Sequence, residues 1–255
     1  MAEGRKILLQ LDIIGCAGSY PAPHSACSSY LVRSGMTSIL FDTGNGSQTN
    51  LYSHIDPADL DAIVISHGHS DHFADLVGIY HYLKYASAPK SPISIFAPED
   101  VFDKLKYLLK PGLLDSTIFA LNPTRPNSEA VVNNISLRFF EANHPVPTLI
   151  TRISDGNSTM CYGADGDVNE HLEAASDGVD LLLGESTWVE RGKSFPIGLH
   201  LDARSLASLA RGANVKSVVI THIAFPADKI KILEIVRQNY SGNPELAREG
   251  SVFHF

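Results

Sequence analysis

Short apolar runs rich in β-branched residues recur along the chain, separated by polar turn residues or by segments with helical spacing. Runs bounded in this way by Gly, Pro, Asn and Asp are typical of β-strands. We predict strands over residues 7–14, 29–32, 38–41, 61–65, 93–96, 117–121, 135–141, 149–154, 159–162, 179–183, 215–221 and, at a sheet edge, 251–255. Apolar residues at helical spacing predict helices around 76–83, over 98–109, from about 168, and over 203–210 and 227–238.

The order of these elements indicates an α/β fold. The turns at Ser34-Gly35 and Asp155-Gly156-Asn157 predict hairpins, and the first three strands predict a meander. Strands and helices then alternate, as they do in α/β proteins. The two halves share a similar order of strands followed by helices. Because the polar segment 122–128 is short enough to be a surface loop, we expect a single domain over residues 1–255.

Composition narrows the classes of function. The 20 basic and 28 acidic residues give a net charge of −8, so no general basic surface attracts structured nucleic acid. A small phosphate ester stays open as a substrate, because bound metal ions reverse the local field. No run approaches the roughly 20 apolar residues of a membrane helix, and the N-terminus leads into a strand and not a signal sequence. We therefore expect a cytoplasmic protein, and the widely spaced Cys16, Cys27 and Cys161 fit reduced thiols.

The segment Ser66-His67-Gly68-His69-Ser70-Asp71-His72 holds four side chains that can bind a transition metal. It lies between a predicted strand and a predicted helix, where His67 and His69 can point the same way and Asp71 occupies the first helical turn. A polar loop that happens to hold three histidines is the alternative. Eleven histidines in the chain make one close pair ordinary, but the HxHxDH spacing in this context is much more specific to a metal site.

Further ligand-type residues follow later strands of the chain. His144, Asp165 and His222 each come directly after a predicted strand, where loops can converge on one pocket. A site with two metals needs more ligands than one loop supplies, and these three residues meet that need. Asp42, in the Gly-rich turn after the third strand, is either ordinary turn chemistry or a support for a metal-binding histidine.

With HxHxDH, a lone His, an Asp after a strand and a late His in this order, nearly the whole chain resembles the metallo-β-lactamase superfamily. The resemblance implies a four-layer αβ/βα sandwich with metals at one edge of two sheets. It also implies two divalent metal ions. One would be held by His67, His69 and His144, the other by Asp71, His72 and His222, with Asp165 bridging them. His69 in place of an acid favours zinc on ligand chemistry, with manganese and iron left open.

Two further segments resemble the ribonuclease Z and phosphodiesterase branch of that superfamily. They are Gly184-Glu185-Ser186-Thr187 and Gly198-Leu199-His200-Leu201-Asp202-Ala203. The resemblance places His200 beside a scissile phosphate with Glu185 in support, so we expect Asp71, Glu185 and His200 to be catalytic. A hydroxide bridging the two metals would be the nucleophile, and His200 would stabilise charge or protonate the leaving oxygen. The alternative is that Glu185 caps a loop and His200 precedes a helix.

The spacing of His144 and Asp165 bears on the substrate. Short ribonuclease Z proteins carry a long tRNA-gripping arm in this interval, whereas here it spans only 21 residues (165 − 144). We therefore favour a small phosphodiester, such as a cyclic nucleotide, over a ribonuclease Z-like cut at the 3′ end of tRNA. A thioesterase, a lactonase, an iron sulfur dioxygenase and a non-catalytic nucleic-acid-binding module stay open as well. Apolar residues of the region 98–121 could form a homodimer interface.

Overall fold

Two mixed β-sheets face each other in the computed structural model, which describes residues 8–110, 112, 114–192 and 196–255. The first sheet has the spatial order β14-β1-β2-β3-β4-β5-β6, and the second β13-β12-β11-β10-β9-β8-β7. The strands of the first are β1 Gln10–Gly15, β2 Ser29–Ser34, β3 Thr37–Phe41, β4 Ala62–Val64, β5 Ile93–Ala97, β6 Phe119–Pro123 and β14 Val252–His254. Those of the second are β7 Glu129–Val132, β8 Ile135–Glu141, β9 Leu149–Ser154, β10 Thr159–Tyr162, β11 Leu181–Glu185, β12 Ser217–Thr221 and β13 Asn243–Leu246.

The two sheets repeat one topology. In the first sheet the pairs from β14 through β3 are antiparallel and those from β3 through β6 are parallel. In the second sheet the pairs from β7 through β10 are antiparallel and those from β10 through β13 are parallel. The similar order of elements in the two halves of the sequence therefore reflects two sheets with the same topology.

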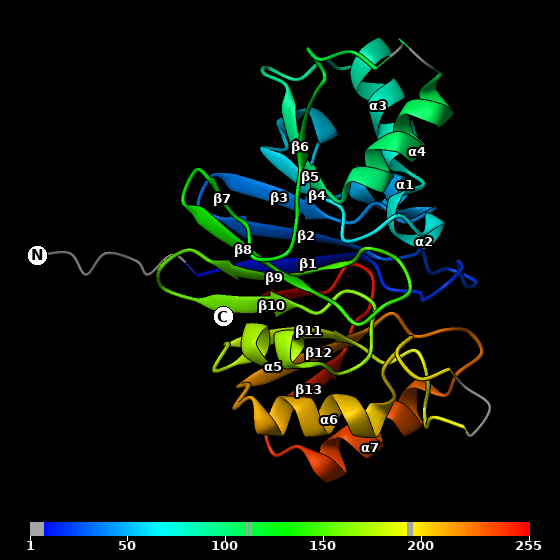
Figure 1. Ribbon diagram of the computed structural model, residues 1–255, viewed down its shortest axis with the longest axis vertical. Coiled ribbons are helices and arrows are strands. Elements are labelled where there is room, and N and C mark those ends of the chain that lie inside the picture. The colour runs from blue at the N-terminus through cyan, green and yellow to red at the C-terminus, as the bar shows by residue number, and fades with distance from the viewer. Residues whose placement is uncertain (1–7, 111, 113, 193–195) are drawn as a thin grey trace, which may run out of the picture.

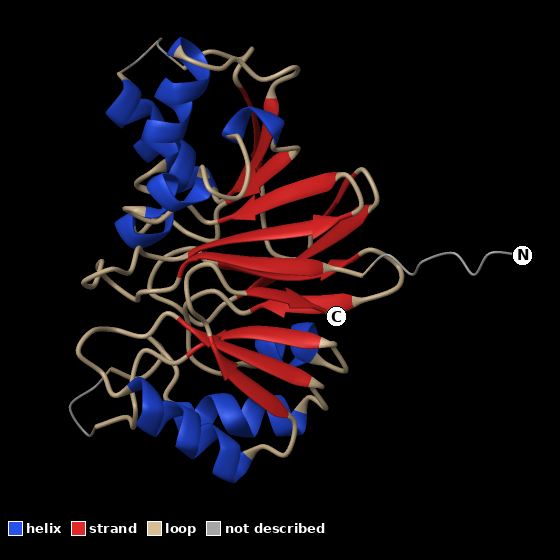
Figure 2. Ribbon diagram, turned by 180° about the vertical axis from the view of Figure 1, so that it is seen from behind, coloured by secondary structure: helices blue, strands red, loops and turns tan. Residues whose placement is uncertain are grey.

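Helices cover the outer face of each sheet (Figure 1), and the view from behind shows the same layers (Figure 2). The helices on the first sheet are α1 Ser47–Leu51, α2 Ser70–Phe73, α3 Leu76–Tyr85 and α4 Glu99–Leu109, with a 3₁₀ turn at Pro57–Asp59. Those on the second are α5 Glu170–Ser176, α6 Ala203–Gly212 and α7 Lys229–Asn239. The predicted four-layer α/β sandwich is thus confirmed.

Alternation along the central strands fills three cores between the four layers. In β2, Tyr30 and Val32 pack into the core between the sheets, whereas Leu31 packs under the helices of the first sheet. Successive side chains of a strand point to opposite faces, so a strand covered on both faces reads as a continuous apolar run. This explains why the central strands were visible as unbroken runs in the sequence.

The elements that the sequence did not predict lie at the sheet edges or are short. The edge strands β7 and β13 have mostly exposed or alternating residues, and β13 contains Pro244. Proline is tolerated in an edge strand because one side of such a strand has no ladder to donate to. Helix α1 has only five residues. The predicted first position of the first strand, residue 7, lies outside the described residues.

Two expectations about the surface relate to the helices. No helix in the described ranges is both long enough and apolar enough to cross a membrane. On α4, in the region expected to form a dimer interface, Tyr107 is 83% exposed and Leu108 is 52% exposed. The homodimer itself stays a prediction.

Candidate metal centre

The residues predicted for the site converge at one edge of the two sheets. The strands that carry them run in the same direction within each sheet, so the carboxyl ends of these strands share that edge. Asp42 follows β3, the segment 66–72 follows β4, His144 follows β8, Asp165 follows β10, Glu185 ends β11 and His222 follows β12. Asp71 and His72 lie in α2, and Asp71 is in its first turn, as predicted.

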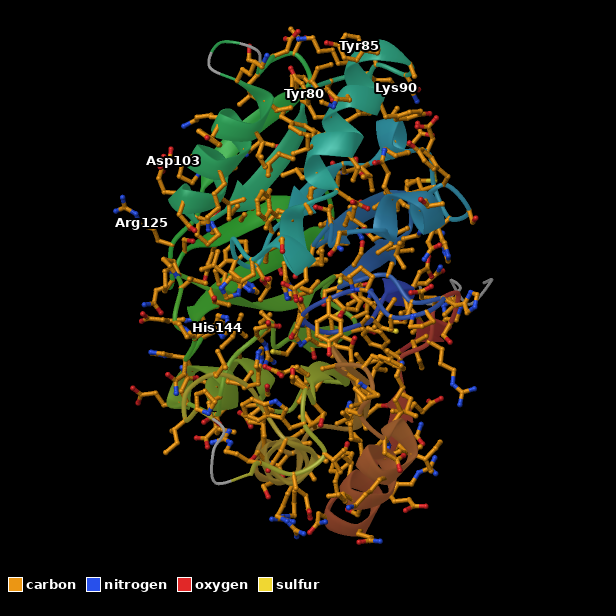
Figure 3. All side chains as sticks on the ribbon, turned by 90° about the vertical axis from the view of Figure 1, so that its right-hand side faces the viewer. Tyr80, Tyr85, Lys90, Asp103, Arg125 and His144 are labelled. Carbon is orange, nitrogen blue, oxygen red and sulfur yellow. The ribbon has the colours of Figure 1, made fainter. Side chains whose placement is uncertain are left out.

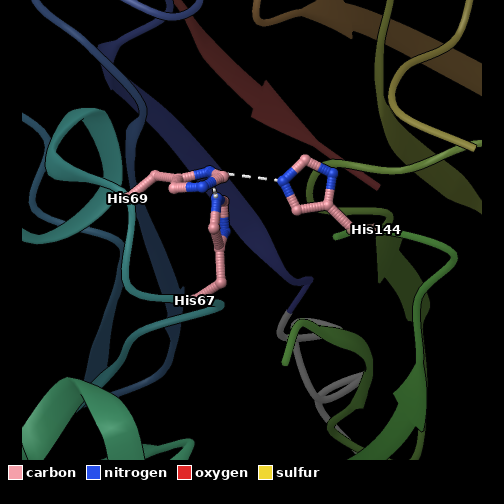
Figure 4. Close-up of side chains that lie close together, drawn as sticks. All are labelled: His67, His69 and His144. Atoms are coloured by element: carbon pink, nitrogen blue, oxygen red, sulfur yellow. Dashed lines mark hydrogen bonds between the residues drawn. The ribbon is translucent and has the colours of Figure 1, made fainter. Parts of the chain in front are cut away.

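Three imidazoles form the first cluster (Figure 4). His69 Nδ1 lies 3.0 Å from His67 Nε2 and 3.3 Å from His144 Nε2. Two nitrogen ligands at 2.0–2.1 Å from a tetrahedral zinc ion lie about 3.3 Å apart. His69 is therefore spaced from each of the other two histidines as one shared cation requires, and all three ligand nitrogens lie within 4.8 Å of one another.

Two carboxylates and two imidazoles form the second cluster, which consists of Asp71, His72, Asp165 and His222. His222 Nε2 lies 3.2 Å from Asp71 Oδ2 and 3.3 Å from both Asp165 Oδ2 and His72 Nε2. His72 Nε2 lies 3.3 Å from Asp165 Oδ2 and 3.5 Å from Asp71 Oδ2. These distances also match a tetrahedral set around one cation.

Asp165 lies between the two clusters. Its Oδ2 is 3.9 Å from His67 Nε2 of the first cluster as well as 3.3 Å from His72 and His222 of the second. Its Oδ1 is buried and has no hydrogen-bond partner among the described residues. A buried, unpaired carboxylate oxygen is costly unless a cation neutralises it. The site therefore fits the two-metal arrangement that the sequence predicts, with Asp165 positioned to bridge.

Hydrogen bonds on the far side of each ring fix the tautomers of three histidines. His72 Nδ1 donates to Asp42 Oδ2 at 2.7 Å, and His222 Nδ1 donates to the Thr187 hydroxyl at 2.9 Å. His144 Nδ1 donates to a backbone carbonyl at 3.0 Å. In a neutral imidazole the other nitrogen then carries the lone pair, and in all three residues that nitrogen, Nε2, faces the clusters. In their neutral form, the three rings therefore present a lone pair to a metal ion in either cluster.

The electrostatics of the buried groups favour a bound cation. Burial lowers the pKa of His67 well below its usual value, and the nearby His72 lowers it further. Burial opposes protonation of His72 as well, yet Asp165 and Asp42 raise its pKa well above the usual range. Burial disfavours the charged form of Asp71, but the close contact with the His222 imidazole and the charge of His72 lower its pKa to about 2. Carboxylates and imidazoles buried this close together favour a bound cation, which is held by ionised carboxylates and neutral imidazoles.

His200 and Glu185 form a hydrogen-bonded pair beside the two clusters. His200 Nδ1 lies 2.9 Å from Glu185 Oε1, and the His200 ring centroid is 5.6 Å from that of His144 and 5.4 Å from that of His222. Burial opposes protonation of His200, but the hydrogen bond and the charge of Glu185 raise its pKa. Among the described residues, the hydrogen bond of the His200 side chain is made through Nδ1 and not through Nε2.

Glu185 is spatially close enough to His200 and His222 to be considered a metal ligand. Its oxygens are already occupied, however. Oε1 accepts from His200 Nδ1 and from the Gly166 amide at 2.8 Å, and Oε2 accepts from the Thr187 hydroxyl at 2.6 Å. A carboxylate saturated in this way orients its partners and does not ligate a cation. The supporting role expected for Glu185 stays a prediction.

Sequence reasoning missed several residues that hold these ligands in place. The hydroxyl of Thr187 connects Glu185 to His222 through two hydrogen bonds. The hydroxyls of Tyr162 and Ser66 both donate hydrogen bonds to Asp42. The Tyr162 hydroxyl donates to Asp42 Oδ2 at 2.5 Å, and the Ser66 hydroxyl donates to the same oxygen at 2.8 Å. Thr187 carried a signal, since a residue two positions after Glu185 in extended chain points to the same side.

The four-layer α/β sandwich carries a His and Asp cluster at one edge of its two sheets, and the comparisons with known proteins place the chain among metallo-hydrolases. The chain belongs to the β-lactamase superfamily, because the family model described as a β-lactamase superfamily domain matches residues 37–223. The expected family is thereby confirmed.

Two relatives in sequence and two solved structures are similar to this chain. The chain is 26% identical over 252 residues to the "Probable metallo-hydrolase YhfI" of Bacillus subtilis, covering 96% of this chain and 99% of that protein. A crystal structure of YhfI matches with a TM-score of 0.88 at 25% identity, covering 98% of this chain and 100% of that one. Ribonuclease Z of Protochlamydia amoebophila is 23% identical over 308 aligned positions, covering 96% of each chain. A diphosphatase of the PhnP family shares the fold with a TM-score of 0.78 at 17% identity, covering 97% of this chain and 98% of that one.

Proposed function

We propose that this metal-dependent hydrolase is a phosphodiesterase that uses two divalent metal ions, most suitably zinc, to cleave a small phosphodiester such as a cyclic nucleotide. The observation that carries the proposal is the Glu185–His200 pair, with 2.9 Å between Oε1 and Nδ1, set beside both clusters. A metal-activated water alone would serve a thioesterase or a lactonase. A held imidazole next to the metals suits a reaction with a phosphate and an alkoxide leaving group.

The two metal ions, when bound, would activate a water molecule and neutralise the phosphate oxygens. The residues of this chain do the rest. Seven residues would hold the ions: His67, His69, Asp71, His72, His144, Asp165 and His222. Glu185 accepts a hydrogen bond from His200 Nδ1, so that Nε2 would be the nitrogen that meets a bound phosphate. With its pKa raised, His200 is positioned to carry a proton toward the leaving oxygen or to stabilise charge on the phosphate.

The segment between His144 and Asp165 supports a small substrate. A loop, the strands β9 and β10 and the turn that joins them occupy it, and both strands pair within the second sheet. No arm extends from this fully described interval to grip a folded RNA. The net charge of −8 also disfavours a large polyanion.

A ribonuclease Z-like cut at the 3′ end of tRNA is the second candidate. The similarity to ribonuclease Z of Protochlamydia amoebophila over 96% of each chain favours it. Both candidates cleave a phosphodiester and both use the same predicted ligands. They differ in whether the surface must bind a large RNA.

A panel of substrates tests the proposal. Purified metal-loaded protein is assayed on cyclic nucleotides, an aryl phosphodiester, an acyl thioester and a precursor tRNA. We expect turnover of the cyclic nucleotides and the aryl ester to exceed that of the tRNA. Activity confined to the thioester would exclude the proposal, and cleavage of the tRNA alone would establish the second candidate.

The role of His200 has its own test. We expect His200→Ala to keep its metals and lose a factor of about 10²–10⁴ in kcat, because a positioned acid or base contributes that much. Metal content is measured on the same samples by mass spectrometry. Full phosphodiesterase activity in a metal-replete His200→Ala protein would rule out this role.

A further inference from the structure

A cavity of about 600 Å³ opens beside the first cluster, with His144 in its wall. The start of α4, the turn after β6, the end of β8 and the loop that follows His144 enclose it. Asp103, Arg125 and His144 follow one another along the same side of the molecule (Figure 3). Cavities of 300–1,000 Å³ hold small organic ligands, so this one has room for the part of a substrate that extends away from the metals.

Proline residues make the walls of this cavity rigid. Pro98, Pro126, Pro145 and Pro147 all line it. The pyrrolidine ring fixes φ, so each of these positions has little backbone freedom to lose when a ligand binds. The cavity is therefore largely preformed, and a ligand that binds there loses less free energy to the ordering of the protein.

The cavity is lined mainly by acidic residues, so its charge would be opposite in sign to that of two bound metal ions. Four carboxylates line it, from Glu99, Asp100, Asp103 and Glu141, against one guanidinium, from Arg125, which gives a formal charge of 1 − 4 = −3. Asp100 Oδ2 is paired with an α4 lysine ammonium at 2.8 Å. The other three carboxylates belong to residues that are largely exposed at the rim. A phosphate is attracted to the metals and repelled from this cavity.

We propose that this cavity receives the uncharged, hydroxyl-bearing organic group of the substrate, such as a nucleoside, and that its carboxylates exclude a second phosphate. The inference rests on the proposed phosphodiesterase function. Carboxylates accept hydrogen bonds from sugar hydroxyls and base amino groups, and the prolines pack against the apolar faces of such a group. A second phosphate in the same place would meet like charges, which is a means of rejecting the wrong substrate. The enzyme thereby selects a diester with a single phosphate.

A matched pair of chromogenic substrates tests this. Thymidine 5′-(p-nitrophenyl phosphate) has one phosphate, and its 3′-phosphorylated analogue differs only by a second one. We expect the wild-type kcat/KM for the analogue to be at least about 10-fold lower at low salt. The second phosphate carries a charge of about −1.5 to −2, so removing one carboxylate about 8 Å away should recover about 4- to 6-fold in a water-like dielectric. We therefore expect Glu99→Gln/Asp103→Asn to narrow the ratio at least about 4-fold.

The control is Glu173→Gln/Glu245→Gln, which removes two exposed carboxylates outside the cavity and should leave the ratio as in the wild type. Calorimetric titration with thymidine 5′-phosphate and thymidine 3′,5′-bisphosphate gives a readout that does not depend on turnover. We expect the bisphosphate to bind with the higher Kd. The ratio should also approach one at 1 M salt, where the Debye length falls to about 3 Å.

The possible failures are separable. If both substrates are hydrolysed with equal kcat/KM at low salt, or if Glu99→Gln/Asp103→Asn changes the ratio no more than the control, the inference about the cavity is wrong while the phosphodiesterase stands. If neither phosphodiester is hydrolysed by the metal-loaded protein, the proposed function itself is wrong.

Discussion

Replacing Thr187 by valine tests how the metal centre is connected to the Glu185–His200 pair. The Thr187 side chain is buried, with 3% of the residue exposed, and its hydroxyl makes two bonds at once. It donates to Glu185 Oε2 at 2.6 Å and accepts from His222 Nδ1 at 2.9 Å. Valine keeps the shape of the side chain and removes both bonds.

Two costs follow from Thr187→Val. The His222 Nδ1 proton loses its acceptor in a buried place, and leaving such a donor unpaired costs about 1–3 kcal/mol. Groups that orient a metal-binding histidine typically change metal affinity or activity 10–100-fold when removed, which is about 1.4–2.7 kcal/mol. We therefore expect zinc affinity to fall 10–100-fold, with a further loss of kcat because Glu185 no longer holds His200 as firmly.

Zinc affinity is measured by competition with a chelator of known affinity, and kcat is measured on an aryl phosphodiester at saturating metal. Thr187→Ser is the matched control, because it keeps the hydroxyl and should recover most of both quantities. Urea unfolding of the metal-free proteins separates a loss of fold from a loss of affinity. If Thr187→Val binds zinc and turns over substrate as the wild type does, the hydroxyl does not couple these groups and the reasoning is refuted.

Three further predictions concern packing, thiol chemistry and pH. A Cβ at Gly18 would lie 2.5 Å from the His222 carbonyl oxygen, which is too close for an unstrained contact. We therefore expect Gly18→Ala to displace His222 and weaken zinc binding in the same competition assay, and unchanged affinity would contradict this. Burial raises the pKa of the Cys161 thiol to about 12, so it should resist alkylation at pH 8 until the protein unfolds, and rapid labelling of the native protein would contradict this. Burial opposes ionisation of Asp180, but the hydrogen bond from Lys216 outweighs it and lowers the pKa. The stabilisation is therefore present above the unfolded pKa of about 3.9 and lost as pH falls through the folded pKa. Asp180→Asn should cost about 1 kcal/mol in urea unfolding at pH 7 and progressively less as the pH falls below about 3.9, and a cost that does not change with pH would contradict this.

The fold was predictable from the sequence wherever burial determines the residue pattern. Central strands such as β2 and β12 are covered on both faces, and their continuous apolar runs indicate this burial in the sequence. The edge strand β13 contains a proline and pairs on one side only, so its pattern is that of a loop. Helix α1 is too short for a helical period to show.

The candidate ligands were predictable because imidazoles and carboxylates follow strands in a fixed order. Their support was not, because it depends on contacts between distant parts of the chain. The Tyr162 hydroxyl reaches Asp42 across 120 residues, and the ring of His222 reaches Thr187 across 35. Tyr162 does not differ in the sequence from an ordinary buried residue, and the position of Thr187 two residues after Glu185 does not show that it also reaches His222. Only the folded chain shows that these hydroxyls hold the site.

Titration of the metal-free protein with zinc is the most direct test of a two-metal phosphodiesterase. Hydrolysis of an aryl phosphodiester is followed as zinc is added to protein from which metal has been removed by chelation. We expect activity to rise from background and to reach its plateau at two equivalents per chain. A plateau at one equivalent, or no phosphodiester hydrolysis at any zinc concentration, would contradict the central claim.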